Sequence, residues 1–146
     1  MTLTVERLPN EPIIIATISG EVHEDTIIDM WRQSLELAKA NGDQHFYRIT
    51  NIQAITTTFR DFIHIVRRAS MGIPGSSSDP NVTVVMVTHN HWAKSFVGAV
   101  EEEQFGALHI PVYDDMERAL AYIRHEIEIA AHKNDRKSAE SEGQKP

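Results

Sequence analysis

Residues 81–88 read NVTVVMVT, a run of β-branched and apolar residues that lies between Pro80 and Asn90. Such a run is typical of a strand in the middle of a sheet, because both of its faces must be covered by apolar neighbours. We therefore expect an α/β fold in which this strand is interior and helices pack on the sheet.

Strands are also predicted elsewhere in the chain. Near the N-terminus Leu3 and Val5 alternate with polar residues, and PIIIATISG (12–20) follows a Pro9-Asn10 turn signal. This pattern predicts two neighbouring strands that can form a hairpin. Two further strands are predicted at HFYRIT (45–50) and LHIPVY (108–113).

Segments with apolar residues at helical spacing alternate with these strands. The clearest, residues 24–42, has Asp25 or Thr26 as its cap candidate and ends at Asn41-Gly42. A second clear helix is predicted at residues 114–132, and two more at residues 57–72 and 92–105. Strands that alternate with helices indicate a mixed or mostly parallel sheet under crossover helices.

Composition restricts the class of protein. The chain has 146 residues, 41% of them hydrophobic, which is enough for one domain with a core. It contains no cysteine, which excludes a disulfide scaffold, a thiolate zinc site and a cysteine nucleophile. The net charge of -7 argues against general affinity for nucleic acid or anionic membranes.

The C-terminal residues differ in composition from the rest. Residues 133–146 hold four basic and three acidic groups, which leaves a net charge of -8 on residues 1–132. Because this segment has no large apolar side chain to bury, we expect it to be a disordered tail after a single α/β domain at 1–132. The first residues resemble neither a signal nor a transit peptide, and no apolar run is long enough to span a membrane. We therefore expect a cytoplasmic protein.

The histidines and serines do not form a recognisable catalytic or metal-binding motif. His89 and His91 flank the end of the 81–88 strand, but no third ligand is fixed by spacing, and surface histidines are the favoured interpretation. On the last helix His125, Glu128 and His132 share a stripe that is best explained as a solvated face. The chain also has no nucleophile elbow, Walker loop or dinucleotide-binding motif. The sequence therefore predicts no catalytic residues, no metal and no cofactor.

The predicted second helix carries the features that suggest binding. Arg60, His64 and Arg67 form a cationic stripe on an otherwise acidic protein, and such a stripe can dock a carboxylate or phosphate of a partner. A solvated face is the competing interpretation, since exposed ion pairs contribute little. At the start of this helix Thr57 and Thr58 are candidate phosphoacceptors, although helix capping alone explains a hydroxyl there.

The order of elements resembles the SpoIIAA-like branch of the STAS superfamily, which has the anti-sigma-factor-antagonist fold. The segments that carry this resemblance include GEVHEDT (20–26), ASMG (69–72) and IPVYDDMERALAYI (110–123). The resemblance covers about residues 3–130. It implies a sheet of four or five strands packed by about four helices, and a non-enzymatic role in protein interaction or small-ligand binding. The serine motif that is phosphorylated in STAS regulators is absent here, so Thr57 or Thr58 is the candidate phosphoacceptor that the resemblance implies.

These observations lead to three functional hypotheses. The leading one is a non-catalytic STAS-like regulatory domain that binds a protein partner, or a second copy of itself, through the surface around the predicted second helix. The alternative is a carrier of a small apolar, lipid-like ligand. Its pocket would be lined by Trp31, Phe59, Phe62 and Trp92. The third is an enzyme with a site built from His89, His91 and His109.

Overall fold

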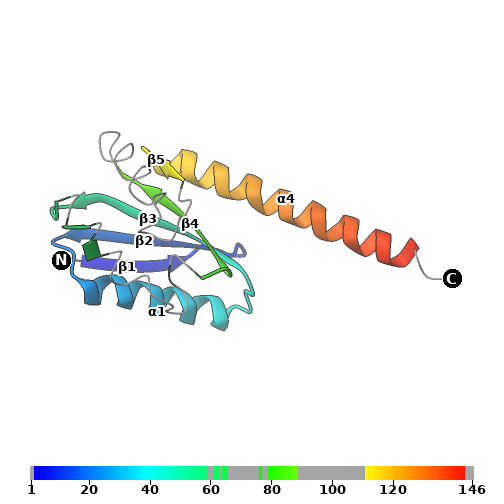
Figure 1. The fold of residues 1–146 in the computed structure, drawn as a ribbon, viewed down its shortest axis with the longest axis horizontal. Helices are drawn as coiled ribbons and strands as arrows, with labels where there is room; N and C mark the ends of the chain where they lie inside the picture. Colours follow the sequence, from blue (N-terminus) through cyan, green and yellow to red (C-terminus); the bar gives the residue numbers. More distant parts are fainter. Residues whose placement is uncertain are drawn as a thin grey trace.

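The structure is a computed structural model that describes residues 2–58, 61–62, 64–65, 76, 79–88 and 111–143, with side chains up to residue 133. Two long helices, α1 and α4, pack on a sheet of five strands (Figure 1). The elements are β1 (Thr2–Arg7), β2 (Ile13–Gly20), α1 (Glu24–Ala40), β3 (Phe46–Ile55), β4 (Val82–Val87), β5 (Val112–Tyr113) and α4 (Met116–Gly143).

The sheet has the order β1-β2-β3-β4-β5. β1 and β2 are antiparallel and form the predicted hairpin, whereas β2, β3, β4 and β5 are parallel to one another. This confirms the expectation of a mixed, mostly parallel sheet. The expected count of four helices is not supported, since the described residues contain only α1 and α4 as long helices. The helices predicted at 57–72 and 92–105 lie mostly or entirely outside the described residues.

β4 has the environment that NVTVVMVT predicts. Val84 and Met86 face one side of the sheet and Val85 and Val87 face the other, and all four are buried. The strand pairs with β3 over its whole length and with β5 at its end. An interior strand covered on both faces is therefore confirmed.

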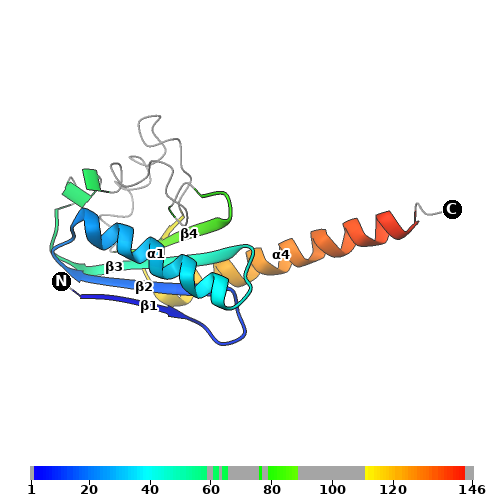
Figure 2. The same ribbon diagram turned by 90° about the horizontal axis from the view of Figure 1, so that it is seen from below.

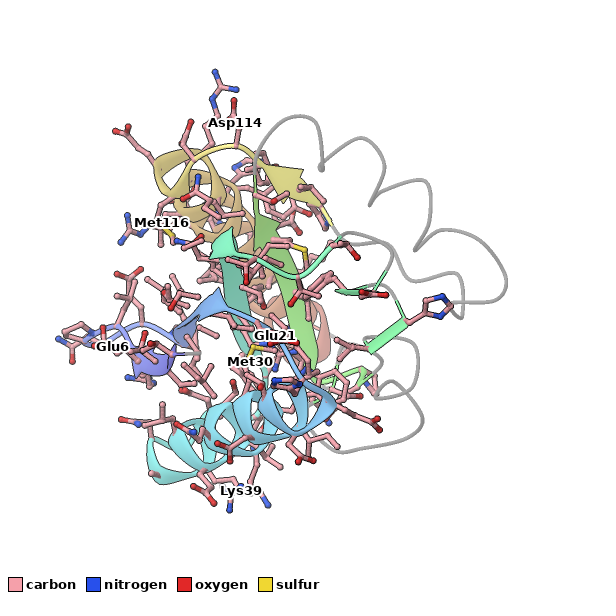
Figure 3. All side chains as sticks on the ribbon, turned by 90° about the vertical axis from the view of Figure 1, so that its left-hand side faces the viewer. Glu6, Glu21, Met30, Lys39, Asp114 and Met116 are labelled. Carbon is pink, nitrogen blue, oxygen red and sulfur yellow. The ribbon has the colours of Figure 1, made fainter. Side chains whose placement is uncertain are left out.

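The two faces of the sheet hold two separate apolar clusters. The cluster on the α1 face contains Ile14, Phe46 and Trp31, and the cluster on the α4 face contains Ile49 and Ile123. Figure 2 shows α1 in front of the sheet and α4 behind it, so the described part of the molecule has three layers. In Figure 3 Met30 lies between α1 and the sheet, while Lys39 is on the opposite side of the helix.

The start of α1 differs from the prediction. Its N-cap is His23, not Asp25 or Thr26, because the helix already begins at Glu24. Thr26 instead lies in the first turn, where its Oγ1 accepts a hydrogen bond of 3.4 Å from the His23 amide. The predicted end is confirmed, since Asn41 is the C-cap and Gly42 has a φ of +73°, a conformation that suits glycine.

α4 is longer than the predicted helix. It begins after Asp115, whose Oδ1 accepts a hydrogen bond of 2.7 Å from the Arg118 amide, and it continues to Gly143. The helix thus includes most of the segment whose composition predicts disorder. No glycine or proline interrupts residues 114–142, and alanine, lysine, arginine and glutamate favour helix there. Both views show its C-terminal part extending past the strands (Figures 1 and 2).

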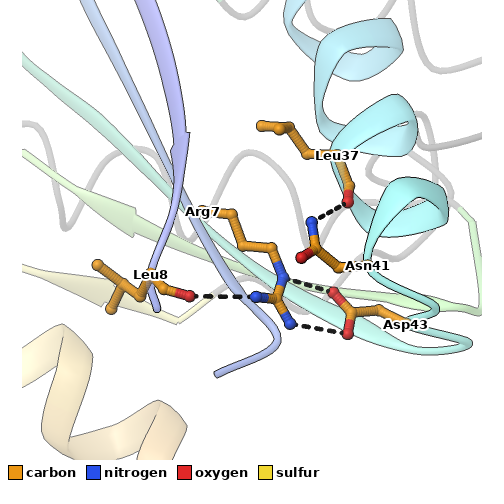
Figure 4. A network of polar contacts seen from close by, with 5 residues as sticks. All are labelled: Arg7, Leu8, Leu37, Asn41 and Asp43. Atoms are coloured by element: carbon orange, nitrogen blue, oxygen red, sulfur yellow. Dashed lines mark hydrogen bonds and ion pairs between the residues drawn. The ribbon is translucent and has the colours of Figure 1, made fainter. Parts of the chain in front are cut away.

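An ion pair between Arg7 and Asp43 connects β1 to the turn after α1 (Figure 4). Arg7 donates from Nε and Nη2 to the two carboxylate oxygens of Asp43, at 2.8 and 3.0 Å. Beside this pair, Asn41 donates to the carbonyl of Leu37 at 2.8 Å and satisfies the end of α1. The edge strand is therefore held by side chains as well as by its pairing with β2. Among the described residues, no helix combines the length and the apolar character needed to cross a bilayer.

Candidate partner-binding site

The candidate site lies where β2 and β3 end side by side. Gly20 and Ile55 are paired in register, and the Thr56 amide donates to the Gly20 carbonyl at 2.9 Å. Gly20 has a φ of +78°, which turns the chain out of β2 toward α1. The carboxyl ends of parallel strands are a usual place for binding sites in α/β sheets, because the loops that follow the strands meet there.

A register shift between β2 and β3 comes shortly before these two strand ends. Thr17 pairs with Asn51, but Ser19 pairs with Ala54, so β3 has one more residue than β2 in this interval. The Gln53 amide donates to Asn51 Oδ1 at 3.0 Å across the shift. Bulges of this kind bend a strand and change where its end points. Sequence patterns did not indicate this shift.

Thr57 connects the turn after β3 to the loop after β2. Its Oγ1 accepts a hydrogen bond of 2.6 Å from the amide of Val22. Val22 is buried, so this hydroxyl satisfies a backbone donor that has left the sheet. Thr57 itself is half-buried. The predicted phosphoacceptor thus has a structural role in this conformation.

Thr58 caps the helical turn that follows. Its Oγ1 accepts a hydrogen bond of 3.2 Å from the Asp61 amide, and its carbonyl accepts one of 2.9 Å from the Phe62 amide. This is the geometry of an N-cap threonine. Thr58 is exposed, and the carboxylate of Asp61 belongs to the same turn.

An open hollow of about 380 Å³ lies between the loop after β2 and the turn after β3. Glu21 and Asp61 contribute carboxylates and Ile65 and Val22 contribute apolar surface. The hollow is lined by Glu21, Val22, Thr56, Thr57, Thr58, Asp61 and Ile65. Figure 3 shows Glu21 at this end of the sheet. Two carboxylates and three hydroxyls favour a positively charged or hydrogen-bond-donating group.

The described residues contain only part of the predicted cationic stripe. His64 is exposed in the turn that follows the hollow. Arg60 and Arg67 lie outside the described residues, so their role stays a prediction. Sequence reasoning had not included Glu21 and Val22 in the site, although their position directly after a strand was a signal for a loop at a sheet edge.

Two residues of the predicted ligand pocket do not line this hollow. Trp31 and Phe62 are each 1% exposed and belong to the apolar cluster on the α1 face. Phe59 and Trp92 lie outside the described residues. A second hollow of about 500 Å³ lies between β1 and α1, and Trp31 and Phe62 do not line it either. Its lining residues are Leu3, His23, Asp25, Thr26, Ile28, Asp29 and Arg32.

A buried cation that the sequence analysis did not consider lies in the α1 face of β3. Arg48 is completely buried, and its register partners are Ile14 on β2 and Val84 on β4. Burial lowers its pKa to about 9, and the nearby negative charge of Asp79 opposes this effect. The available signal was its spacing, since Arg48 is two residues after the inward-facing Phe46.

The predicted histidine sites fall into two groups. His125, Glu128 and His132 are exposed on α4, as a solvated stripe requires. His89, His91 and His109 lie outside the described residues. Within the ranges that the structure describes, no group of three or more histidine, aspartate or glutamate side chains could hold a metal ion.

Comparison with protein-family models, with curated proteins and with solved structures finds no significant match for this chain.

Proposed function

We propose that the protein is a non-catalytic, STAS-like regulatory domain of the cytoplasm that binds a protein partner at the carboxyl ends of β2 and β3. The observation that supports this function is the hollow between the loop after β2 and the threonine turn after β3. It is open and is lined by Glu21 and Asp61, and the hydroxyls of Thr57 and Thr58 already accept hydrogen bonds from backbone amides. A preformed polar recess suits recognition of a partner side chain, because binding then costs little conformational entropy.

The recess favours one kind of group from the partner. A lysine or arginine side chain would place its charge between two carboxylates and its apolar stem against Val22 and Ile65. The predicted stripe of Arg60, His64 and Arg67 follows on the same segment and would bind acidic groups. We therefore expect the partner surface to carry charges of both signs, with a basic residue at the centre.

Charge reversal in the recess tests this function. The double variant Glu21→Lys/Asp61→Lys should lose the partner, since it would place positive charges against the basic group. The matched control is Glu117→Lys/Glu128→Lys, two exposed glutamates of α4 that do not line the recess. The measurement is quantitative capture with each bait, followed by titration of the purified partner against each purified variant.

The expected outcome is a partner that binds the wild type and the α4 control equally and binds the recess variant at least about tenfold more weakly. Arg60→Glu/Arg67→Glu should weaken the same partner. Equal binding to the wild type, the recess variant and the stripe variant would exclude this surface. Circular dichroism of each variant establishes that the fold is retained.

The alternative function, a carrier of an apolar ligand, has less support. Trp31 and Phe62 pack in the core and line neither of the two hollows described above. Native mass spectrometry of the protein purified from a lipid-rich extract tests it. A co-purifying ligand that is displaced by Phe62→Trp would favour the carrier over the interaction domain.

A further inference from the structure

β1 is an edge strand whose free backbone groups can be assigned. In the described sheet it pairs only with β2. The Leu8 amide donates to the Ile13 carbonyl at 2.9 Å, and the register continues without a shift from there to Thr2 and Ser19. Bonded and non-bonded pairs alternate in an antiparallel ladder. The positions whose backbone bonds to β2 are therefore Thr2, Thr4 and Glu6, and the positions whose backbone groups point outward are Leu3, Val5 and Arg7.

This edge has few of the features that normally prevent pairing. Natural edge strands are protected by prolines, bulges, inward-pointing charges or very short length. β1 is six residues long, contains no proline and has no bulge against β2. Its charged residues, Glu6 and Arg7, are at its C-terminal end, and Arg7 is held by Asp43. Its centre is the exposed Thr4.

We propose that a second copy of this chain binds along this edge, β1 against β1 in antiparallel orientation, about a two-fold axis at Thr4. Residues that are directly opposite in a sheet face the same side, so the two-fold axis must lie midway between the two copies of one residue. An axis at Thr4 places Leu3 of each copy opposite Val5 of the other. Both are outward-bonding positions, and both are half-buried apolar residues that pack on the α1 face.

The charges beside the edge support the same arrangement. The hollow between β1 and α1 carries Asp25 and Asp29 toward the start of the helix and Arg32 farther along it. α1 runs in the same direction as β1 (Figure 1), so this two-fold axis makes the α1 helices of the two copies antiparallel as well. The acidic part of each hollow is then turned toward Arg32 of the second copy. Arg32 is exposed and already pairs with Asp29 in its own helix, so it can be shared across the axis.

Lysine substitutions two residues apart on β1 test the register. Thr4→Lys places two lysines directly opposite each other at the axis, where non-hydrogen-bonded pairs approach most closely, and should raise the dissociation constant of the dimer about tenfold or more. Thr2→Lys is the matched control. It places a lysine opposite Glu6 of the second copy and should leave the dimer unchanged or tighter. Both threonines are exposed, so both variants should fold.

A mixing experiment uses the same position. Thr4→Lys and Thr4→Glu should each dimerise about tenfold or more weakly alone than the wild type does, and a mixture of the two should form a tighter heterodimer, because opposite charges then meet at the axis. Sedimentation equilibrium measures each mass, with wild-type protein up to about 0.5 mM, where a micromolar dimer is saturated. The supporting result is a wild-type dimer, a higher dissociation constant in both single variants and recovery of the dimer in the mixture.

Two results would overturn the proposal. One is wild-type protein that stays monomeric over the whole concentration range. The other is a dimer that Thr4→Lys weakens no more than Thr2→Lys does, which would assign the contact to another surface. Neither result affects the proposed partner site, whose readout is binding of a different protein to the recess between Glu21 and Asp61.

Discussion

Arg124 of α4 holds both carboxylate oxygens of Glu11, with Nε 3.0 Å from Oε2 and Nη2 3.1 Å from Oε1. Glu11 belongs to the turn between β1 and β2, so this pair joins the first hairpin of the chain to its last helix, 113 residues away in sequence. Two parallel hydrogen bonds make the contact directional as well as electrostatic.

The first prediction concerns this pair and pH. The hydrogen bonds from Arg124 lower the pKa of Glu11 from its ordinary value of 4.5. A carboxylate whose pKa is lowered in the folded state stabilises the protein above its unfolded-state pKa and loses this effect as pH falls through the folded-state value. Glu11→Gln should therefore be slightly less stable than the wild type at neutral pH, and the difference should disappear in acid.

Urea unfolding of both proteins from neutral pH down to about pH 3 measures this difference. Arg124→Gln removes the same pair from the α4 side, and its difference from the wild type should disappear over the same acid range. A difference between the wild type and Glu11→Gln that stays constant through the acid range would contradict the prediction.

The second prediction concerns Thr57 and Val22. Thr57→Val keeps the shape of the side chain but removes the acceptor of the Val22 amide, and a buried donor without an acceptor costs about 1–3 kcal/mol. Thr57→Ser retains the oxygen and should lose much less. Chemical denaturation gives the free energies of unfolding, and amide hydrogen exchange at Val22 reports the bond directly. Unchanged exchange at Val22 in Thr57→Val would show that another group accepts this hydrogen bond.

The third prediction concerns the cap at Thr58. Thr58→Ala should destabilise the protein by about 1 kcal/mol, because the Asp61 amide loses its capping oxygen. Thr58→Asp should keep most of the stability, since aspartate is an equally good N-cap. Thermal unfolding compares the two. If aspartate were as destabilising as alanine, repulsion from Asp61 would outweigh capping, and a phosphate at Thr58 would then weaken this turn.

The fourth prediction concerns the buried Arg48. Removing one charge of a buried interaction is destabilising, because the charge that remains loses its compensation. Asp79 lies near Arg48, so Arg48→Met should lower the free energy of unfolding, but by less than Arg48→Ala does, since methionine keeps most of the side-chain volume. Arg48→Ala leaves a cavity and should lower stability by about 2–4 kcal/mol. Equal losses in both variants would mean that the charge itself, and not the volume of its stem, is required at this position.

Much of the fold could be predicted from local sequence patterns, whereas the candidate site could not. The NVTVVMVT run, the β1–β2 hairpin and the end of α1 at Asn41 were predictable because each depends on residues close in sequence. Another feature depends on which segments meet in space. The contact between Val22 and Thr57 needs β2 and β3 to end side by side, and no spacing in the sequence gives that distance.

Arg48 and α4 show two further limits of local patterns. A single arginine in a strand is usually assigned to the exposed face, and only the pairing of β3 between β2 and β4 makes its position interior. For α4, composition and helix propensity pointed in different directions, and the structure follows propensity as far as Gly143. The STAS resemblance and the cationic stripe stay predictions.

The division of the apolar clusters has a consequence for synthesis of the chain. Ile13, Ile49 and Val85 are covered by Ala119 and Ile123, which are added more than 30 residues after β4 has been made. One face of the sheet therefore stays without its helix until α4 leaves the ribosome, whereas α1 is available to cover the other face much earlier. A nascent chain halted before α4 should bind chaperones and hydrophobic dyes through that face, and release of the complete chain should end this exposure.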